Sequence, residues 1–224
     1  MLSLPTAARF VPSPSARRLV LFDVMDTLVA DPFFGGFEKD LFGLEGGIKS
    51  LFAIKDQKSF VAFEKGEISE AEHFETYFND RRTCDGEAVR AYLTGRYAWL
   101  PGMRELATDL NAAGVQMAAF SNYPKEWAVL VEDACGLSSV VPWGLVSGEA
   151  GVRKPEPEAF EAALKAVGRE KGDVIFVDDS TTNTDAATAL GIVSIRFEGA
   201  DALRPQLFEL LGLPHGNAPG NARL

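Results

Sequence analysis

The sequence predicts an α/β fold built on a parallel sheet, with a small all-helical segment inserted after the first strand. The first observation is that short apolar runs of strand length alternate with stretches of helical periodicity over most of the chain. The second is that residues 33–98 contain one helical pattern after another and no convincing strand. Because strands that alternate with helices pair in parallel through right-handed crossovers, we expect a single parallel sheet.

Length and composition limit the kinds of protein that the chain can form. Its 224 residues suffice for one substantial core and a small second domain, and 46% of them are hydrophobic. A net charge of −10 argues against a nucleic-acid partner, which needs a basic surface. No apolar run approaches the ~20 residues that span a bilayer, so we expect no membrane partner. We also expect the protein to be a monomer. The two cysteines form no disulfide framework, which is typical of a reducing compartment.

The first strand is predicted at residues 19–22, where four apolar residues run directly into Asp23. A strand that is apolar at every position is typical of the centre of a parallel sheet, buried on both faces. Ligands bind at the carboxyl ends of such strands, where the strand order reverses. A carboxylate at this point can act as a nucleophile or as a metal ligand. The structural alternative is an aspartate that caps a turn, with Thr27 closing it.

The remaining elements follow in order. A Pro- and Gly-rich linker at 30–36 leads into three to four expected helices, one of them starting at a capping box formed by Ser69 and Glu72. His73, in that helix, is expected at the surface. After the insertion we expect helices at 101–110, 124–136, 155–168, from after Asp179 to Gly191, and 201–211, and strands at 115–120, 140–146, 174–177 and 192–197.

Both ends of the chain are expected to be disordered. Residues 1–18 contain arginine, serine and proline but no acidic residue, as in the tail of an organelle transit peptide or in any unstructured basic N-terminus. Residues 213–224 are rich in proline, glycine and asparagine, a composition that is typical of a disordered tail.

Polar residues follow the predicted strands at what should be one edge of the sheet. Each of them alone has a plain structural explanation, such as a helix cap or a solvated loop residue. Their order and spacing together are far more specific. The set consists of Asp23 and Thr27, Ser121 and Asn122, Lys154, and finally Asp178, Asp179 and Asn183.

Over residues 19–212 this pattern resembles the haloacid dehalogenase-like (HAD) superfamily. Four segments are similar to its motifs I to IV: Phe22–Leu28 (FDVMDTL), Phe120–Asn122 (FSN), Val152–Pro155 (VRKP), and Phe176–Ser180 (FVDDS) with Asn183. The resemblance implies a Rossmann-like parallel-sheet core formed by 19–32 and 99–212. It also implies that the helical segment 33–98 is a C1 cap domain.

The resemblance assigns roles to these residues. It implies that Asp23 attacks phosphorus and forms an aspartyl-phosphate, while Lys154 neutralises the charge that develops on the phosphoryl group. The family's cofactor, Mg²⁺, would be held by Asp23, Asp178 and Asp179, together with the backbone carbonyl of Met25.

The substrate would be a small phosphorylated molecule held at the same edge of the sheet. The resemblance implies that Ser121 binds a phosphoryl oxygen, and that Thr27, Asn122 and Tyr123 belong to the substrate-binding set along with Lys154. Phe33 and Phe34, in the linker, are placed to meet a ligand. The aromatic residues Phe52, Phe60, Phe63, Phe74 and Phe78 are expected to form the core of the cap, because their spacing is helical.

One position departs from the phosphatase pattern. Where phosphatases of the family carry a second aspartate as general acid and base, this chain has Met25, which cannot transfer a proton, and Asp26 is adjacent. General acid catalysis is worth about 10²–10⁴-fold, so its loss would slow turnover without abolishing it. A dehalogenase, a phosphonate hydrolase with a reactive cap lysine (Lys49, Lys55, Lys58 or Lys65), and a phosphate-binding pseudoenzyme therefore remain alternatives.

A closer similarity favours the phosphatase. Four segments together resemble a plant group within the superfamily, the plastid hydrolases of flavin mononucleotide (FMN): residues 22–28, 63–66, 120–124 and 176–179. That similarity implies hydrolysis of FMN to riboflavin and phosphate, and a chloroplast location, with the cytoplasm as the alternative. Another small phosphorylated metabolite is the alternative substrate. The missing proton donor would be replaced by Asp26, by water or by a substrate hydroxyl.

Overall fold

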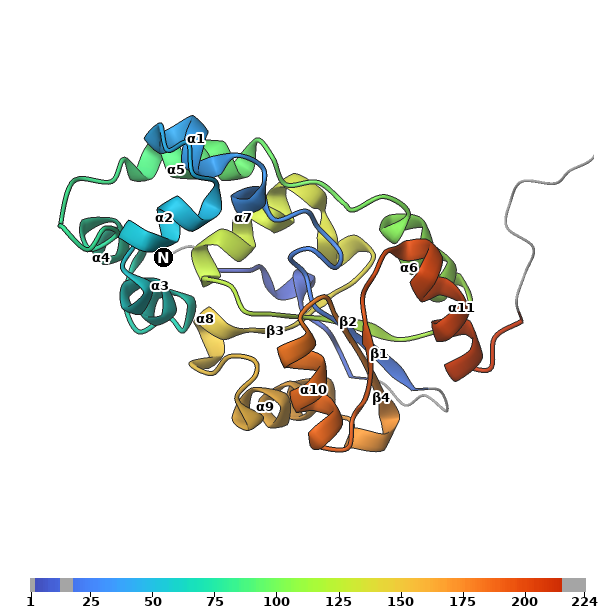
Figure 1. The fold of residues 1–224 in the computed structure, drawn as a ribbon. Helices are drawn as coiled ribbons and strands as arrows, with labels where there is room; N and C mark the ends of the chain where they lie inside the picture. The colour runs from blue at the N-terminus through green and yellow to red at the C-terminus, as the bar shows by residue number, and fades with distance from the viewer. Residues whose placement is uncertain (1–2, 13–17, 215–224) are drawn as a thin grey trace, which may run out of the picture.

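The structure, a computed structural model, describes residues 3–12 and 18–214 (Figure 1). Within them, one sheet of five parallel strands has the order β3-β2-β1-β4-β5, which confirms the predicted α/β class. The strands are β1 (Leu19–Phe22), β2 (Met117–Ser121), β3 (Trp143–Val146), β4 (Val174–Asp178) and β5 (Val193–Arg196). β3 begins after Pro142, because proline has no N–H to donate to a neighbouring strand.

Helices cover both faces of the sheet. One hydrophobic cluster joins a face of the sheet to α6 (Met103–Ala112), α7 (Lys125–Cys135) and α11 (Ala200–Leu210), and a second joins the other face to α9 (Pro157–Val167) and α10 (Thr181–Ala189). Along β1, Val20 and Phe22 belong to the first cluster, whereas Leu19 and Leu21 belong to the second. This two-sided burial is the reason that β1 is apolar at every position.

The strand order places a topological switch point at the end of β1. From β1 the chain proceeds to β2 and β3 on one side, and later to β4 and β5 on the other. Phe22 pairs with Ala119 of β2 and with Val177 of β4, so Asp23 and Asp178 are the next residues along two neighbouring strands. A crevice at such a point is where open α/β sheets bind ligands.

The insertion between β1 and α6 contains five α-helices among the described residues, one more than the upper number expected. They are α1 (Phe37–Phe42), α2 (Ile48–Ile54), α3 (Gln57–Glu64), α4 (Glu70–Glu75) and α5 (Gly86–Thr94). Glycines in the left-handed region separate the first two, which are too short to be evident from periodicity. The capping box of Ser69 and Glu72 starts α4 as predicted.

The interior of the insertion differs from expectation at two positions. His73 is fully buried rather than exposed, because α4 turns it towards α3, where its ring stacks on Phe63 at 4.8 Å and its Nδ1 lies 2.8 Å from Ser59 Oγ. Phe52, expected in this core, is 44% exposed. The Phe63 ring also meets Trp127 of α7 at 5.1 Å, so a single core runs from the insertion onto the sheet.

The insertion docks onto the loop that follows β3. Ser147 begins the short helix α8 (Ser147–Ala150), and its hydroxyl donates to the Glu64 carbonyl at the end of α3, at 2.6 Å. The Glu64 carboxylate lies 2.6 Å from the guanidinium of Arg153. Gly66 passes so close to Gly148 that an added Cβ would lie 2.2 Å from the Gly148 carbonyl oxygen. These contacts fix the insertion beside the residue that precedes Lys154.

The ends of the chain correct part of the expected disorder. Residues 3–12 contain a 3₁₀ helix, η1 (Thr6–Ala8), and pack on the sheet through Leu4 and Ala8, which are 5% and 2% exposed. The apolar residues among the arginines supply this packing. At the other end Leu213 is buried, whereas 1–2, 13–17 and 215–224 lie outside the described residues. In the described part of the chain no helix has both the length and the apolarity to cross a membrane.

Candidate active site

Lys154 joins the ends of three strands. Its Nζ lies 2.5 Å from Asp23 Oδ1 after β1 and 2.7 Å from Asp178 Oδ2 at the end of β4, and it donates to the Phe120 carbonyl of β2 at 2.9 Å. Lys154 is 1% exposed. The structure therefore brings together the nucleophile, the lysine and one of the paired aspartates that the sequence placed at this edge.

The charges in this group depend on one another. Burial raises the pKa of Asp23, while the Lys154 ammonium acts against that rise. Burial alone would lower the pKa of Lys154, but the carboxylates of Asp23 and Asp178 outweigh it and the pKa is raised. Lys154 is consequently a permanent cation at neutral pH, which suits it to stabilise negative charge on a bound group.

The two paired aspartates differ in their surroundings. Asp178 is fully buried, and its carboxylate also accepts hydrogen bonds from the Ser180 N–H at 2.9 Å and from the Asn183 amide at 3.0 and 3.1 Å. Asp179 is exposed, and its N–H donates to the Thr27 hydroxyl at 3.2 Å. Thr27, predicted to bind substrate, therefore ties the Asp179 loop to the loop after β1.

The acidic residues have the arrangement of a cation site. Asp23, Asp178 and Asp179 each place a carboxylate oxygen within 4.8 Å of the others. Partial burial raises the pKa of Asp179, and repulsion from the Asp178 carboxylate adds to that effect. Hard carboxylate oxygens are the ligands that Mg²⁺ prefers, and a divalent cation would relieve this repulsion, so the residues fit that ion.

Met25 and Asp26 lie in the loop after Asp23. Met25 and Val29 form an isolated β-bridge. In this bridge the Val29 N–H donates to the Val24 carbonyl and the Asp26 N–H donates to the Val29 carbonyl, so the Met25 carbonyl takes no part in it. Asp26 has a left-handed backbone, with φ of 54°, and its Oδ1 accepts the Asp31 N–H at 2.9 Å. Burial raises the pKa of Asp26.

The predicted residues after β2 have three different environments. Ser121 Oγ is buried and has no hydrogen-bond partner among the described residues, as expected of an atom that awaits a ligand. The Asn122 amide instead clamps the backbone of Lys154, with contacts of 2.7 and 2.8 Å. Tyr123 is 3% exposed, and its hydroxyl lies 2.7 Å from the Tyr97 hydroxyl.

The structure adds Asp31 to the residues found in the sequence, and it distinguishes Lys55 from the other three lysines named for the insertion. Asp31, in the linker to the insertion, has its pKa raised to about 7, chiefly by burial. Lys55, after α2, is 3% exposed, and burial lowers its pKa to about 7. Nothing in the local pattern distinguishes Lys55 from the other lysines of the insertion. The Asp31–Pro32 pair indicates only a turn.

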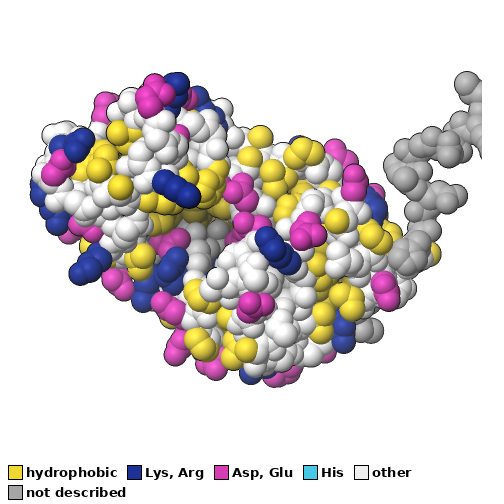
Figure 2. All heavy atoms as spheres, in the orientation of Figure 1, with side chains coloured by type: hydrophobic (Ala, Val, Ile, Leu, Met, Phe, Trp, Pro, Cys, Tyr) yellow, Lys and Arg dark blue, Asp and Glu magenta, His cyan; other side chains and the backbone are white. Residues whose placement is uncertain are grey.

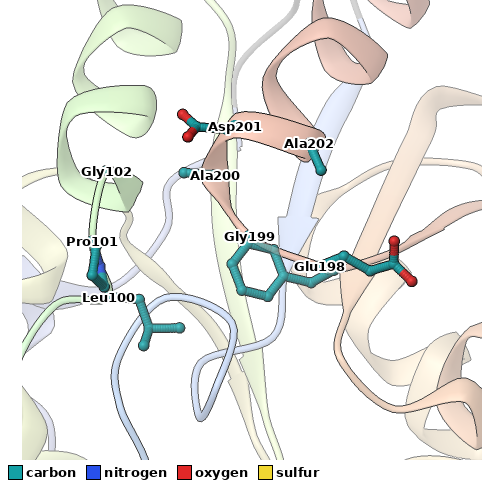
Figure 3. A pocket seen from close by; sticks show the side chains of 9 residues that line it. Leu100, Pro101, Gly102, Glu198, Gly199, Ala200, Asp201 and Ala202 are labelled. Carbon is teal, nitrogen blue, oxygen red and sulfur yellow. The ribbon is translucent and has the colours of Figure 1, made fainter.

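A hollow separates the insertion from the rest of the molecule, and hydrophobic and acidic side chains lie along it (Figure 2). Of the linker aromatics, Phe33 is 6% exposed and Phe34 is 61% exposed. A different pocket, of about 530 Å³, lies between α6 and α11 (Figure 3). Its charged side chains are Glu198 and Asp201, and none of the three carboxylates of the cation site lines it.

A parallel α/β sheet that gathers carboxylates and a lysine at its switch point defines a hydrolase with an acidic centre. The chain belongs to the haloacid dehalogenase-like hydrolase family, whose model matches residues 18–191. This family membership confirms the resemblance that the four motifs indicated.

Individual proteins sharpen the comparison. The chain is 38% identical to flavin mononucleotide hydrolase 1 of Arabidopsis thaliana, a protein named as chloroplastic, over 86% of this chain and 77% of that protein. It is 30% identical to a phosphoglycolate phosphatase of Pseudomonas savastanoi, over 42% of this chain and 35% of that protein. A HAD family enzyme of Bacteroides thetaiotaomicron, solved with magnesium and inorganic phosphate, matches with a TM-score of 0.65 at 21% identity, over 81% and 94% of the two chains.

Proposed function

We propose that the protein is a Mg²⁺-dependent phosphomonoester hydrolase that acts through an aspartyl-phosphate, with FMN as its preferred substrate. The observation that carries this proposal is the convergence of three carboxylates and the Lys154 ammonium at one edge of the sheet. A carboxylate held beside a fixed cation is suited to attack a phosphoryl group, since the cation offsets the repulsion between the two anions.

Each residue has a part in this proposal. Asp23 attacks phosphorus in line with the leaving oxygen, and water later hydrolyses the aspartyl-phosphate. Lys154 lies against the Asp23 carboxylate and stabilises charge on the phosphoryl oxygens. Ser121 supports the phosphoryl group, because its buried hydroxyl lacks a partner among the described residues. Asn122 acts through Lys154, whose backbone it holds.

The cation site belongs to the same proposal. Asp23, Asp178 and Asp179 would hold Mg²⁺, with the Met25 carbonyl as a further ligand. The bound ion would polarise the phosphoryl oxygens as a Lewis acid. Thr27 and Asn183 hold the Asp179 backbone and the Asp178 carboxylate in place.

The choice of FMN rests on the similarity to the Arabidopsis enzyme. Hydrolysis would give riboflavin and phosphate. We further propose that 19–32 and 99–212 act as the catalytic core and that 33–98 acts as a cap that excludes bulk water from the substrate. A plastid location is proposed on the name of that relative alone.

A phosphatase panel tests the proposal. Purified protein with Mg²⁺ is expected to release phosphate from FMN faster than from sugar phosphates, phosphoglycolate or a phosphonate, and the isosteric change Asp23→Asn is expected to stop release. Activity that persists in excess EDTA, or chloride release from a 2-haloacid without metal, would contradict the mechanism. Binding of FMN without turnover would instead identify a pseudoenzyme.

A further inference from the structure

The proposed reaction leaves one proton without a donor. When the P–O bond to an alkyl leaving group breaks, the alkoxide oxygen needs a proton, and the Met25 side chain cannot supply one. A group that does so must reach the cleft and must be protonated near neutral pH. Between the sheet edge and the insertion, Asp26 and Asp31 carry carboxyl groups in the loop and linker after β1.

Asp31 is held at the junction of these two parts of the chain. It lies in the linker from the loop after β1 to the insertion, and it caps the 3₁₀ helix η2 (Pro32–Phe34) by accepting the Phe33 N–H on Oδ1 at 2.9 Å. Its own N–H donates to Asp26 Oδ1, also at 2.9 Å. The contact with Phe33 fixes the orientation of the carboxyl group, the contact with Asp26 fixes the backbone of Asp31, and the cap does not use the second oxygen, Oδ2.

Charged groups from several elements affect the pKa of the Asp31 carboxyl. Burial is the main cause that raises its pKa to about 7; the Phe33 N–H and the Lys55 ammonium lower the pKa, whereas Asp26 and Asp179 raise it. The hydroxyls of Tyr97 and Tyr123 also sense its charge. Asp31 thus interacts electrostatically with Asp179 of the cation site and with Lys55 of the insertion.

We propose that Asp31 is the general acid that protonates the leaving-group oxygen, which takes the place of the acid missing at Met25. The inference rests on the proposed phosphatase function. As Asp23 bonds to phosphorus, the P–O bond to the leaving group breaks and the Asp31 proton passes to that oxygen, giving the alcohol. The Asp31 carboxylate then takes a proton from the water that attacks the aspartyl-phosphate, which releases phosphate and restores both aspartates.

Asp26 is the competing carboxyl, and it differs from Asp31 in its place, because it lies in the loop after β1 whereas Asp31 lies in the linker and caps η2. Burial raises the pKa of Asp26 as well, and the Asp31 N–H that its Oδ1 accepts acts against that rise. The side chain of Asp26 thus holds the backbone of Asp31. Asp26 therefore acts by positioning Asp31, and Asp26→Asn provides the matched control, because asparagine retains an oxygen for the same N–H.

Two substrates that differ in the leaving group test the proposal. Asp31→Asn retains the helix cap through its amide oxygen but cannot donate an acidic proton. We expect it to lower kcat/KM for FMN by about 10²–10⁴-fold and to change kcat/KM for p-nitrophenyl phosphate by less than ~10-fold, because nitrophenolate leaves without a proton and kcat/KM reports only the steps up to release of the leaving group. Equal losses on both substrates, or an FMN-selective loss in Asp26→Asn but not in Asp31→Asn, would overturn the assignment.

The pH profile provides a second readout. Because the acid must be protonated in the first step, wild-type kcat/KM for FMN is expected to fall above pH ~7, and this fall should disappear in Asp31→Asn. Lys55→Met removes a cation that lowers the pKa of Asp31, so it should move the fall to higher pH. An alkaline limb that is unchanged in both variants would refute the role. If wild-type protein cleaves p-nitrophenyl phosphate but not FMN, only the FMN proposal fails, and phosphoglycolate replaces FMN as the alkyl substrate.

Discussion

Two buried lysines show how differently the two parts of this molecule treat the same side chain. Lys154, at the sheet edge, is 1% exposed and lies within 2.7 Å of two carboxylates. Lys55, in the insertion, is 3% exposed, and its Nζ lies over the ring of Phe60 at 3.6 Å and within 5.1 Å of the ring centroids of Phe33 and Tyr77. Among the described residues, no carboxylate lies within ion-pair distance of Lys55.

The two environments move the pKa in opposite directions. Burial disfavours the ammonium at both positions, but at Lys154 the two carboxylates outweigh that cost and raise the pKa. At Lys55 burial dominates over the more distant Asp31 and Glu64, and the pKa falls to about 7. Burial by itself therefore does not fix the charge of a lysine, because the anions in direct contact decide it.

Removing Lys154 should have the largest effect. Lys154→Met leaves Asp23 and Asp178 buried without their cation, which should lower the free energy of unfolding by about 3–5 kcal/mol and abolish turnover. Urea unfolding in EDTA at pH 8 measures the loss. Part of it should return at acidic pH, as the two carboxyls become protonated. The exposed Lys165→Met is the control and should change stability by less than ~0.5 kcal/mol. An equal loss of stability in Lys154→Met and Lys165→Met would show that the two buried carboxylates do not depend on the Lys154 cation.

Removing the Lys55 ammonium should change the free energy of unfolding in the opposite direction and stabilise the protein. The folded pKa of about 7 lies below the usual value, so between pH 7 and 10.5 the unfolded chain binds the extra proton and wild-type stability rises with pH. Lys55→Met should raise the free energy of unfolding at pH 7 by about 1–3 kcal/mol and flatten that rise. Thermal unfolding across this pH range measures both. A destabilised variant with the wild-type slope would show that the cation–π contacts dominate.

The close contact between Gly66 of the insertion and Gly148 of α8 should tolerate an added side chain less well than the open turn at Gly43 does. Gly66→Ala would place Cβ against the Gly148 carbonyl, whereas Gly43→Ala has the same left-handed backbone with nothing within 4 Å of the new atom. We expect Gly66→Ala to be less stable than Gly43→Ala by about 1–2 kcal/mol. Denaturant unfolding of the pair isolates the packing cost from the backbone strain. Equal losses would mean that the insertion moves away from α8 without cost.

The smallest effect concerns the other buried base of the insertion. Burial lowers the pKa of His73 to about 3. Below its usual value of about 6.5 the unfolded chain gains a proton that the folded chain does not, so stability falls as pH falls from 6.5 towards 3. His73→Leu should reduce that slope by about 1 kcal/mol per pH unit. Urea midpoints at pH 7, 6 and 5 measure it, and parallel curves for the two proteins would contradict a neutral buried imidazole.

The sequence alone determined the sheet and the residues at its edge. The four apolar residues before Asp23 predict a strand buried on both faces, and the alternation of strands with helices predicts parallel pairing. Once the strands are parallel, their carboxyl ends share an edge, so Asp23, Ser121 and Asp178 must approach one another. These inferences needed only local patterns and the rules of chain connection.

Only the tertiary structure decided what surrounds each side chain. Asn122 and Tyr123 follow Ser121 directly, yet one clamps Lys154 and the other is buried against Tyr97. The burial of His73 and Lys55 depends on how the short helices of the insertion pack on one another, and the spacing of residues along the chain does not reveal that packing. The physical reason is that periodicity reports which face of an element is apolar, whereas burial and charge depend on residues far away in sequence.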